Sequence, residues 1–299
     1  MSRFIFPNET TPDVKPLHGA VGVELPDANA LAVPEAIRAS AQSHACVLLR
    51  RQKLSPEDLL TVAERLGVPL PPYRPQFSVP GFPEVVQIGN IRENGQLTSY
   101  LNRGGIEWHT DSPGSSHPPG FSLLYCLESQ LPDGGGETGF VSTVSGYASL
   151  ARDLQTAVKD LELVHSFNTF NDQVAEYAGS EVPAQTGELR NRNEDTADPM
   201  VQTHPATGAT HLYFSHAMIK DIPALGRQAG MDLVMRVHDA ITAEPLVYRH
   251  IWEPGDLVVF DNRTCLHTPY PYAFDDYPRT RRLLHQIIIG GRAPESRSA

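Results

Sequence analysis

Short apolar runs separated by turn residues dominate this chain after Gly67. "EVVQIGNI", "FSLLYCLE", "GDLVVFDN" and "RRLLHQIIIGG" are four of these runs, and each has about the length of one β-strand. Strands that recur far apart in the sequence, without a helix between each pair, favour a closed or double-layered antiparallel sheet over regular βαβ units. The expected fold class is therefore α+β and mainly β.

Helices are expected before this strand-rich pattern and as interruptions within it. "PEAIRASAQSHACVLLR" begins as an amphipathic helix and runs into an apolar strand. In "LSPEDLLTVAERLG", Ser55 is placed to cap a helix, Pro56 takes its first position and Gly67 ends it. "SGYASLARDLQTAVKDLE" and "QAGMDLVMRVHDAITAEP" predict further helices. Residues 171–199 are polar and turn-rich, which indicates a functional loop or disorder, and a lid over a pocket is one interpretation.

Composition restricts the class of partner. A length of 299 residues suits one large domain or two ordinary ones, and a net charge of −11 opposes binding to nucleic acid or an anionic membrane. Three widely spaced cysteines give neither a disulfide framework nor a zinc site, and are expected to be reduced core residues. No long apolar run or leader-like N-terminus is present, so a cytoplasmic protein with a small-molecule partner is expected.

A His-x-Asp pair lies in "EWHTDSP", where His109 and Asp111 are two residues apart. On a strand, residues at i and i+2 point to the same face, so both side chains could bind one metal ion. With twelve histidines in the chain, the pair can also arise by chance as a strand-end histidine and a turn aspartate. His267, in "EPGDLVVFDNRTCLHTPYP", would complete a facial triad of two histidines and one carboxylate, which suits iron(II) better than zinc.

Arg282 follows in "RTRRLLHQIII", where strand alternation directs Arg282 and Gln286 to one face. A buried guanidinium needs an anion, either the carboxylate of a cosubstrate or an acidic neighbour such as Asp261, Asp275 or Asp276. The glycines of "PDGGGETGF" predict a tight turn rather than a phosphate loop, because no Gly-Lys-Ser/Thr follows them. Thr138, after this turn, could offer its hydroxyl to the same carboxylate, or could be an ordinary strand residue.

Four separated motifs, "WHTDSP", "GGETGF", "PGDLVVFDNRTCLH" and "RTRRLLHQIIIGG", resemble the iron(II)- and 2-oxoglutarate-dependent dioxygenases of the taurine dioxygenase and phenoxyacetate dioxygenase group. The resemblance runs from "GAVGVELPD" to Gly291 and covers nearly the whole chain. It implies a double-stranded β-helix, or jelly roll, with helices packed outside. The implied organisation is one catalytic domain over residues 1–299, with a helical portion at about 15–70, a jelly-roll core at about 84–292 and the lid at about 171–199.

The resemblance also implies residue roles. His109, Asp111 and His267 would bind iron(II), and Thr138 and Arg282 would bind the distal carboxylate of 2-oxoglutarate. Dioxygen would then oxidise an unactivated C–H bond of a small or medium-sized organic substrate, as 2-oxoglutarate is decarboxylated to succinate. Because the position of Asp111 holds a small residue in the related halogenases, its carboxylate argues against halogenation.

Substrate contacts follow from the same resemblance. In taurine dioxygenase an arginine four positions after the cofactor arginine holds the substrate sulfonate, but Gln286 stands there in this chain, so taurine is an unexpected substrate. Gln286 could bond a neutral polar group or be satisfied within its strand. Other candidate contacts are Tyr73, Asn102 and Phe167, with Arg74 and Arg103 available for an anionic substrate.

Three functional alternatives follow from these residues. We expect an oxygenase, with a homodimer or homotetramer as a possible assembly. A jelly-roll binding protein with a vestigial metal site is the second interpretation, and a metal-dependent hydrolase that needs neither oxygen nor 2-oxoglutarate is the third. Among the other histidines, His204, His211 and His285 are interpreted as structural, whereas His216 could line a pocket.

Overall fold

The structure is a computed structural model. It describes residues 13–101, 107–111, 113, 119–178, 187–191 and 194–290.

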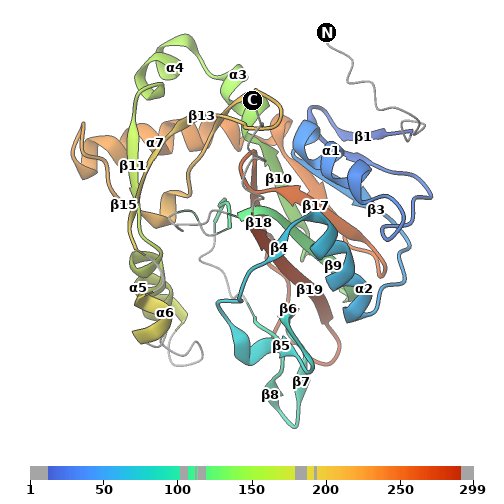
Figure 1. Cartoon of the computed structure of the whole chain (residues 1–299). Helices are drawn as coiled ribbons and strands as arrows, with labels where there is room; N and C mark the ends of the chain where they lie inside the picture. The colour runs from blue at the N-terminus through green and yellow to red at the C-terminus, as the bar shows by residue number, and fades with distance from the viewer. Residues whose placement is uncertain are drawn as a thin grey trace.

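A large sheet and a smaller sheet form the centre of the molecule (Figure 1). The large sheet is built around β9 (Pro119–Gln130) and β19 (Arg281–Gly290), which pair antiparallel along nearly their whole length. β17 (Leu257–Asp261) pairs with the other edge of β9, and β6 (Phe82–Gly89) with the other edge of β19. The sheet is completed by β1 (Lys15–His18), β2 (Val21–Glu24), β3 (Cys46–Leu49), β4 (Val68–Pro69) and β5 (Ser78–Val79).

The smaller sheet has β10 (Thr138–Ser142) at its centre, between β16 (Tyr248–His250) and β18 (Cys265–Pro269). Side chains from both sheets share one apolar core, in which the rings of Phe140 and Phe260 lie 5.5 Å apart. The two sheets therefore pack against each other, and the antiparallel, mainly β prediction is confirmed. The pairing of β2 with β3 is parallel.

Helices α1 (Pro34–His44) and α2 (Pro56–Leu66) pack on the large sheet. The helix predicted from Pro56 begins and ends as expected. Ser55 Oγ accepts a hydrogen bond from the Asp58 N–H at 3.1 Å, and the Asp58 carboxylate accepts one from the Ser55 N–H at 2.9 Å. This reciprocal capping satisfies two backbone donors that the first turn of the helix would leave unpaired.

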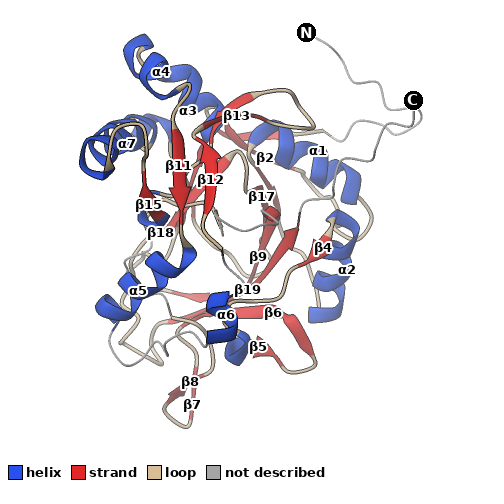
Figure 2. Cartoon of the chain, turned by 60° about the vertical axis from the view of Figure 1, so that its left-hand side comes forward, coloured by secondary structure: helices blue, strands red, loops and turns tan. Residues whose placement is uncertain are grey.

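A second apolar core joins the smaller sheet to helices on its outer side (Figure 2). The helix predicted for "SGYASLARDLQTAVKDLE" is instead two short helices, α3 (Thr143–Ser149) and α4 (Arg152–Val158), because Leu150 and Ala151 adopt extended ψ angles. The predicted helix near "QAGMDLVMRVHDAITAEP" is α7 (Arg227–Ile241).

The predicted loop at 171–199 is only partly correct. Its described residues form most of α5 (Phe167–Ala178), all of α6 (Gly187–Asn191) and β12 (Thr196–Pro199). α5 lies against the 3-10 helix η3 (His216–Met218). The remaining short elements are η1 (Pro75–Phe77), β7 (Arg92–Glu93), β8 (Gln96–Leu97), β11 (Glu162–His165), β13 (Val201–Thr203), β14 (Thr210–Leu212), β15 (Ile219–Asp221) and η4 (Glu244–Leu246).

Two sequence predictions concern properties beyond the fold. The three cysteines, Cys46, Cys126 and Cys265, are free and buried, as predicted. None of the helices in the described part of the chain is long and apolar enough to cross a membrane.

Candidate metal centre and the cavity around it

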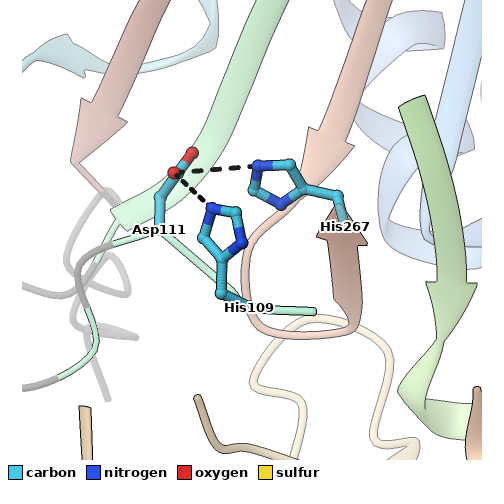
Figure 3. Close-up of side chains that lie close together, drawn as sticks. All are labelled: His109, Asp111 and His267. Carbon is cyan, nitrogen blue, oxygen red and sulfur yellow. Dashed lines mark ion pairs between the residues drawn. The ribbon is translucent and has the colours of Figure 1, made fainter. Parts of the chain in front are cut away.

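The three predicted metal ligands lie together (Figure 3). Asp111 Oδ1 is 3.9 Å from Nε2 of His109 and 3.9 Å from Nε2 of His267, and the candidate ligand atoms all lie within 4.8 Å of one another. Two imidazole nitrogens and one carboxylate oxygen around a common point are the donor set of non-haem iron(II) oxygenases. The residues present therefore fit a divalent metal ion.

Backbone pairing sets the position of the two histidines. His267 lies on β18, and His109 joins it through two backbone hydrogen bonds of 3.0 and 2.8 Å, so that the two imidazoles are adjacent. His109 Nδ1 donates to the Glu107 carbonyl at 2.7 Å, which leaves the lone pair of Nε2 for the metal. The strand-like placement expected for the His-x-Asp pair thus brings all three side chains to one site.

Two further residues hold the carboxylate of Asp111. Ser122 Oγ donates to Asp111 Oδ2 at 2.5 Å, while Asn262 Nδ2 donates to Ser122 Oγ at 2.8 Å. Because a serine hydroxyl has only one proton, the bond from Asn262 leaves that proton directed at Oδ2, and Oδ1 stays free to face the histidines. Neither role was predicted, although Asn262 lies in the quoted motif "PGDLVVFDNRTCLH".

Burial controls the charge of the triad. It lowers the pKa of His109 to about 3, with a smaller contribution from His267, and it lowers the pKa of His267 to about 4. Burial raises the pKa of Asp111, partly opposed by His109 and by the Ser122 hydrogen bond. Both imidazoles are therefore neutral at pH 7, which is the form that binds a metal ion.

Arg282 is buried and has no acidic partner among the described residues. Its Nε donates to the Gly136 carbonyl at 3.1 Å, and burial lowers its pKa. Two of the neighbours considered from the sequence have other partners: Asp261 lies 3.1 Å from His204, and Asp276 pairs with Arg279. The guanidinium is thus available for an anionic ligand.

The glycine run explains how the backbone approaches Arg282. Gly134, Gly135 and Gly136 have φ of 77°, 87° and 71°, in the left-handed region that favours glycine. A Cβ on Gly136 would lie 2.5 Å from Leu131 Cδ1 and 3.3 Å from Arg282 Cδ. The turn predicted from these glycines is therefore present, and it brings the Gly136 carbonyl to the guanidinium.

Thr138 begins β10 directly after this turn and is buried. Its Oγ1 accepts a hydrogen bond from Trp252 Nε1 at 2.9 Å. An indole N–H can only donate, so the hydroxyl proton of Thr138 remains free to donate to a ligand. Trp252 was not predicted, because no spacing in the sequence links it to Thr138.

One cavity of about 670 Å³ contains the metal triad together with Thr138 and Arg282. Leu284, Gln286 and Ile288 also line it, which confirms the predicted alternation along β19. The Gln286 amide has no hydrogen-bond partner in the described part of the chain, so it is not the satisfied strand residue considered above. The predicted substrate contacts Tyr73 and Phe167 line the cavity, as do Arg74, Phe170, Met218 and His238.

The other predicted residues have different surroundings. Asn102 and Arg103 lie outside the described residues. His204, His211 and His285 are buried and do not line the cavity, in agreement with a structural role. His216 does not line it either, but its Nε2 donates to the Glu107 carboxylate at 2.8 Å.

Comparison with known proteins assigns the family. The family described as "Taurine catabolism dioxygenase TauD, TfdA family" matches residues 12–287. The chain belongs to this family. (S)-phenoxypropionate/alpha-ketoglutarate-dioxygenase of Sphingobium herbicidovorans is 29% identical over 95% of this chain and 97% of that protein. An alpha-ketoglutarate-dependent sulfate ester dioxygenase of Pseudomonas putida is 27% identical over 94% of this chain and 90% of its own length.

Solved structures agree with the family assignment. A taurine dioxygenase from Burkholderia xenovorans superposes with a TM-score of 0.72 and 25% identity, covering 94% of this chain and 90% of that chain. This TauD/TfdA chain is therefore a dioxygenase whose reaction uses iron(II), 2-oxoglutarate and dioxygen. The resemblance seen in the sequence motifs is confirmed.

Proposed function

We propose that this TauD/TfdA dioxygenase binds iron(II) through His109, Asp111 and His267, and the distal carboxylate of 2-oxoglutarate through Arg282 and Thr138. The observation that carries the proposal is that the triad lines the same cavity as a buried guanidinium that has no acidic partner among the described residues. We further infer that the two packed sheets form a double-stranded β-helix. Residues 1–299 would then be one catalytic domain, with a helical portion at about 15–70 and the jelly-roll core at about 84–292.

The chain's own residues prepare the site for this reaction. Bound iron(II) supplies activation of dioxygen, coupled to decarboxylation of 2-oxoglutarate to succinate and to oxidation of a substrate C–H bond. His109, Asp111 and His267 would hold the metal ion through two imidazoles and one carboxylate, and a set of only three protein ligands would leave room for the cosubstrate and dioxygen. Arg282 and Thr138 orient the cosubstrate by its far carboxylate, and burial of the triad limits the access of water.

The substrate is a small or medium-sized organic molecule that occupies the rest of the cavity, against Tyr73, Phe167 and Gln286. Gln286 lacks the charge of an arginine, so it cannot form an ion pair with a sulfonate, and we infer that taurine is not the substrate. Asn102 and Arg103 remain candidate contacts. The segment at about 171–199, which begins within α5, is proposed to determine much of the specificity, because Phe170 and Asn171 of α5 line the cavity.

Titration of the apoprotein under anaerobic conditions tests this function. Iron(II) is added first and 2-oxoglutarate second, and the visible charge-transfer band of the chelated cosubstrate is recorded. We expect the band only when both are present, followed by succinate release once oxygen and a substrate are supplied. Absence of the band at saturating iron and cosubstrate would contradict the proposal and favour a binding protein with a vestigial metal site.

A further inference from the structure

We propose that His238 is a substrate-recognition residue, and that the substrate joins an apolar body to a hydroxyl or N–H group that donates a hydrogen bond to His238 Nε2. This inference rests on the proposed function, because it names the chemistry of that site's substrate. The starting observation is that the buried imidazole of His238 lines the cavity and that its Nε2 has no hydrogen-bond partner among the described residues.

His238 lies on α7 and is 8% exposed. Its Nδ1 is 2.9 Å from Oδ1 of Asp239, and a carboxylate can only accept, so the ring proton is on Nδ1. In the neutral form of the ring the lone pair lies on Nε2, which is buried and has no hydrogen-bond partner among the described residues. A buried acceptor left unpaired is unfavourable, so a ligand that donates a hydrogen bond to this atom would be stabilised.

Neighbouring side chains fix the orientation of the His238 ring. The ring of His216 meets it edge to face, with centroids 4.8 Å apart. His216 Nε2 in turn donates to the carboxylate of Glu107, whose backbone carbonyl accepts from the metal ligand His109. His238 is thus held in place by residues that also contact the metal centre, which is the condition for precise recognition of a substrate.

The same part of the cavity wall is otherwise apolar. Phe167, Phe170 and Met218 form one buried cluster, with Tyr73 and Ala217 packed against it. Asn171, a polar residue of the cavity wall that directly follows Phe170 in α5, already donates to the Phe167 carbonyl at 2.8 Å. A ligand at this wall therefore buries hydrocarbon against the rings and needs a donor group only where it meets His238.

Three matched small aromatic probes test the assignment: phenol, which donates; anisole, which only accepts; and toluene, which does neither. They are titrated by ligand-observed NMR into protein loaded with iron(II) and 2-oxoglutarate without oxygen. We expect phenol to bind about tenfold more tightly than anisole or toluene, because only phenol pairs the buried nitrogen.

Variants locate the effect. His238→Leu should abolish the preference for phenol and leave anisole binding unchanged, and His238→Gln, which retains an acceptor, should restore part of it. His285→Leu removes a buried imidazole outside the cavity and should change nothing.

Equal binding of the three probes would overturn the inference, and is the result expected if a buried water already pairs Nε2 of His238. Binding of none of the probes would also overturn it. Persistence of the preference in His238→Leu would also overturn it, and would assign the acceptor of the phenol O–H to another group of the cavity, such as the Gln286 amide oxygen. The visible band of the same samples reports the iron and 2-oxoglutarate chemistry separately, so a failure of the proposed function is distinguishable from a failure of this inference.

Discussion

The cavity has two kinds of wall, and their hydrogen bonding differs. On the strands β10 and β19, the side chains of Thr138 and Arg282 are each held by a neighbour, Trp252 and the Gly136 carbonyl, and direct their remaining donors at a ligand. On α5 and η3, Phe167, Phe170 and Met218 form an apolar cluster, and α7 adds the imidazole of His238, whose Nε2 has no hydrogen-bond partner in the described part of the chain. We propose that the side chains on the strands hold the dianionic cosubstrate and that those on the helices select the substrate.

The largest expected effect comes from breaking the metal site that both walls share. His267→Ala removes one of three ligands and should weaken iron(II) binding by more than about a hundredfold, beyond the range typical of outer contacts to a metal ligand. Equilibrium dialysis of the metal measures this loss. His285→Ala, at a buried imidazole of the same chain outside the cavity, should bind iron like the wild type. Equal affinity of His267→Ala and wild type would remove His267 from the ligand set.

The next largest effect is expected from removing the positive charge of Arg282, on the strand side of the cavity. Arg282→Gln should raise the Kd of 2-oxoglutarate by about a hundredfold, because truncation of one partner of a buried charge pair costs about 2–5 kcal/mol. Iron affinity should not change. Arg281→Gln is a matched control, since the adjacent Arg281 pairs with Glu128 at 2.7 Å and does not line the cavity. An equal loss in both variants would mean a general effect on the strand rather than carboxylate binding.

A smaller effect is expected at the support of Asp111. Ser122→Ala removes the hydrogen bond to Asp111 Oδ2 and should lower iron(II) affinity by about tenfold, as for other residues that orient metal ligands. Cobalt(II) absorption gives a second measurement, because the band shape changes if the carboxylate rotates. Ser129→Ala, in the same strand β9 but outside the cavity lining, should leave both measurements unchanged.

The smallest effect is expected at Trp252, which positions Thr138 on β10 but is not proposed to contact 2-oxoglutarate itself. Trp252→Phe deletes the N–H that holds Thr138 and should raise the Kd of 2-oxoglutarate by about fivefold, the effect of one ordinary hydrogen bond. The control Tyr248→Phe removes a nearby hydroxyl that contacts His250 at 2.8 Å instead. No change in Trp252→Phe would show that Thr138 holds its orientation without the indole.

The sequence predicted the cavity residues on β10 and β19 far better than those on α5, η3 and α7. Alternation along one strand was enough to place Arg282 and Gln286 on the same face, and the motif order brought His109, Asp111 and His267 together. Ser122, Asn262 and Trp252 were not assigned. Asn262 contacts Ser122 and Trp252 contacts Thr138 across more than 100 residues of sequence, and no local period encodes the contact of Ser122 with Asp111. Likewise, His238 looks like any polar residue of an amphipathic helix until the fold brings η3 beside α7.

The lengths of the helices show a similar limit. The composition of the segment at 171–199 indicated a loop, but packing against η3 stabilises α5 over part of it. Local propensity is a weak guide where tertiary contacts decide, and this applies most strongly to the part of the cavity that meets the substrate.

A crystal structure with manganese(II) and 2-oxoglutarate would test the two-wall account most directly. It should show the metal bound by Nε2 of His109 and His267 and by Asp111 Oδ1, with the far carboxylate of 2-oxoglutarate on Arg282 and Thr138, and with open space beside His238. A carboxylate held instead at Arg74 or His238, or a metal bound away from the triad, would contradict the assignment of the cosubstrate to the strands and of the substrate to the helices.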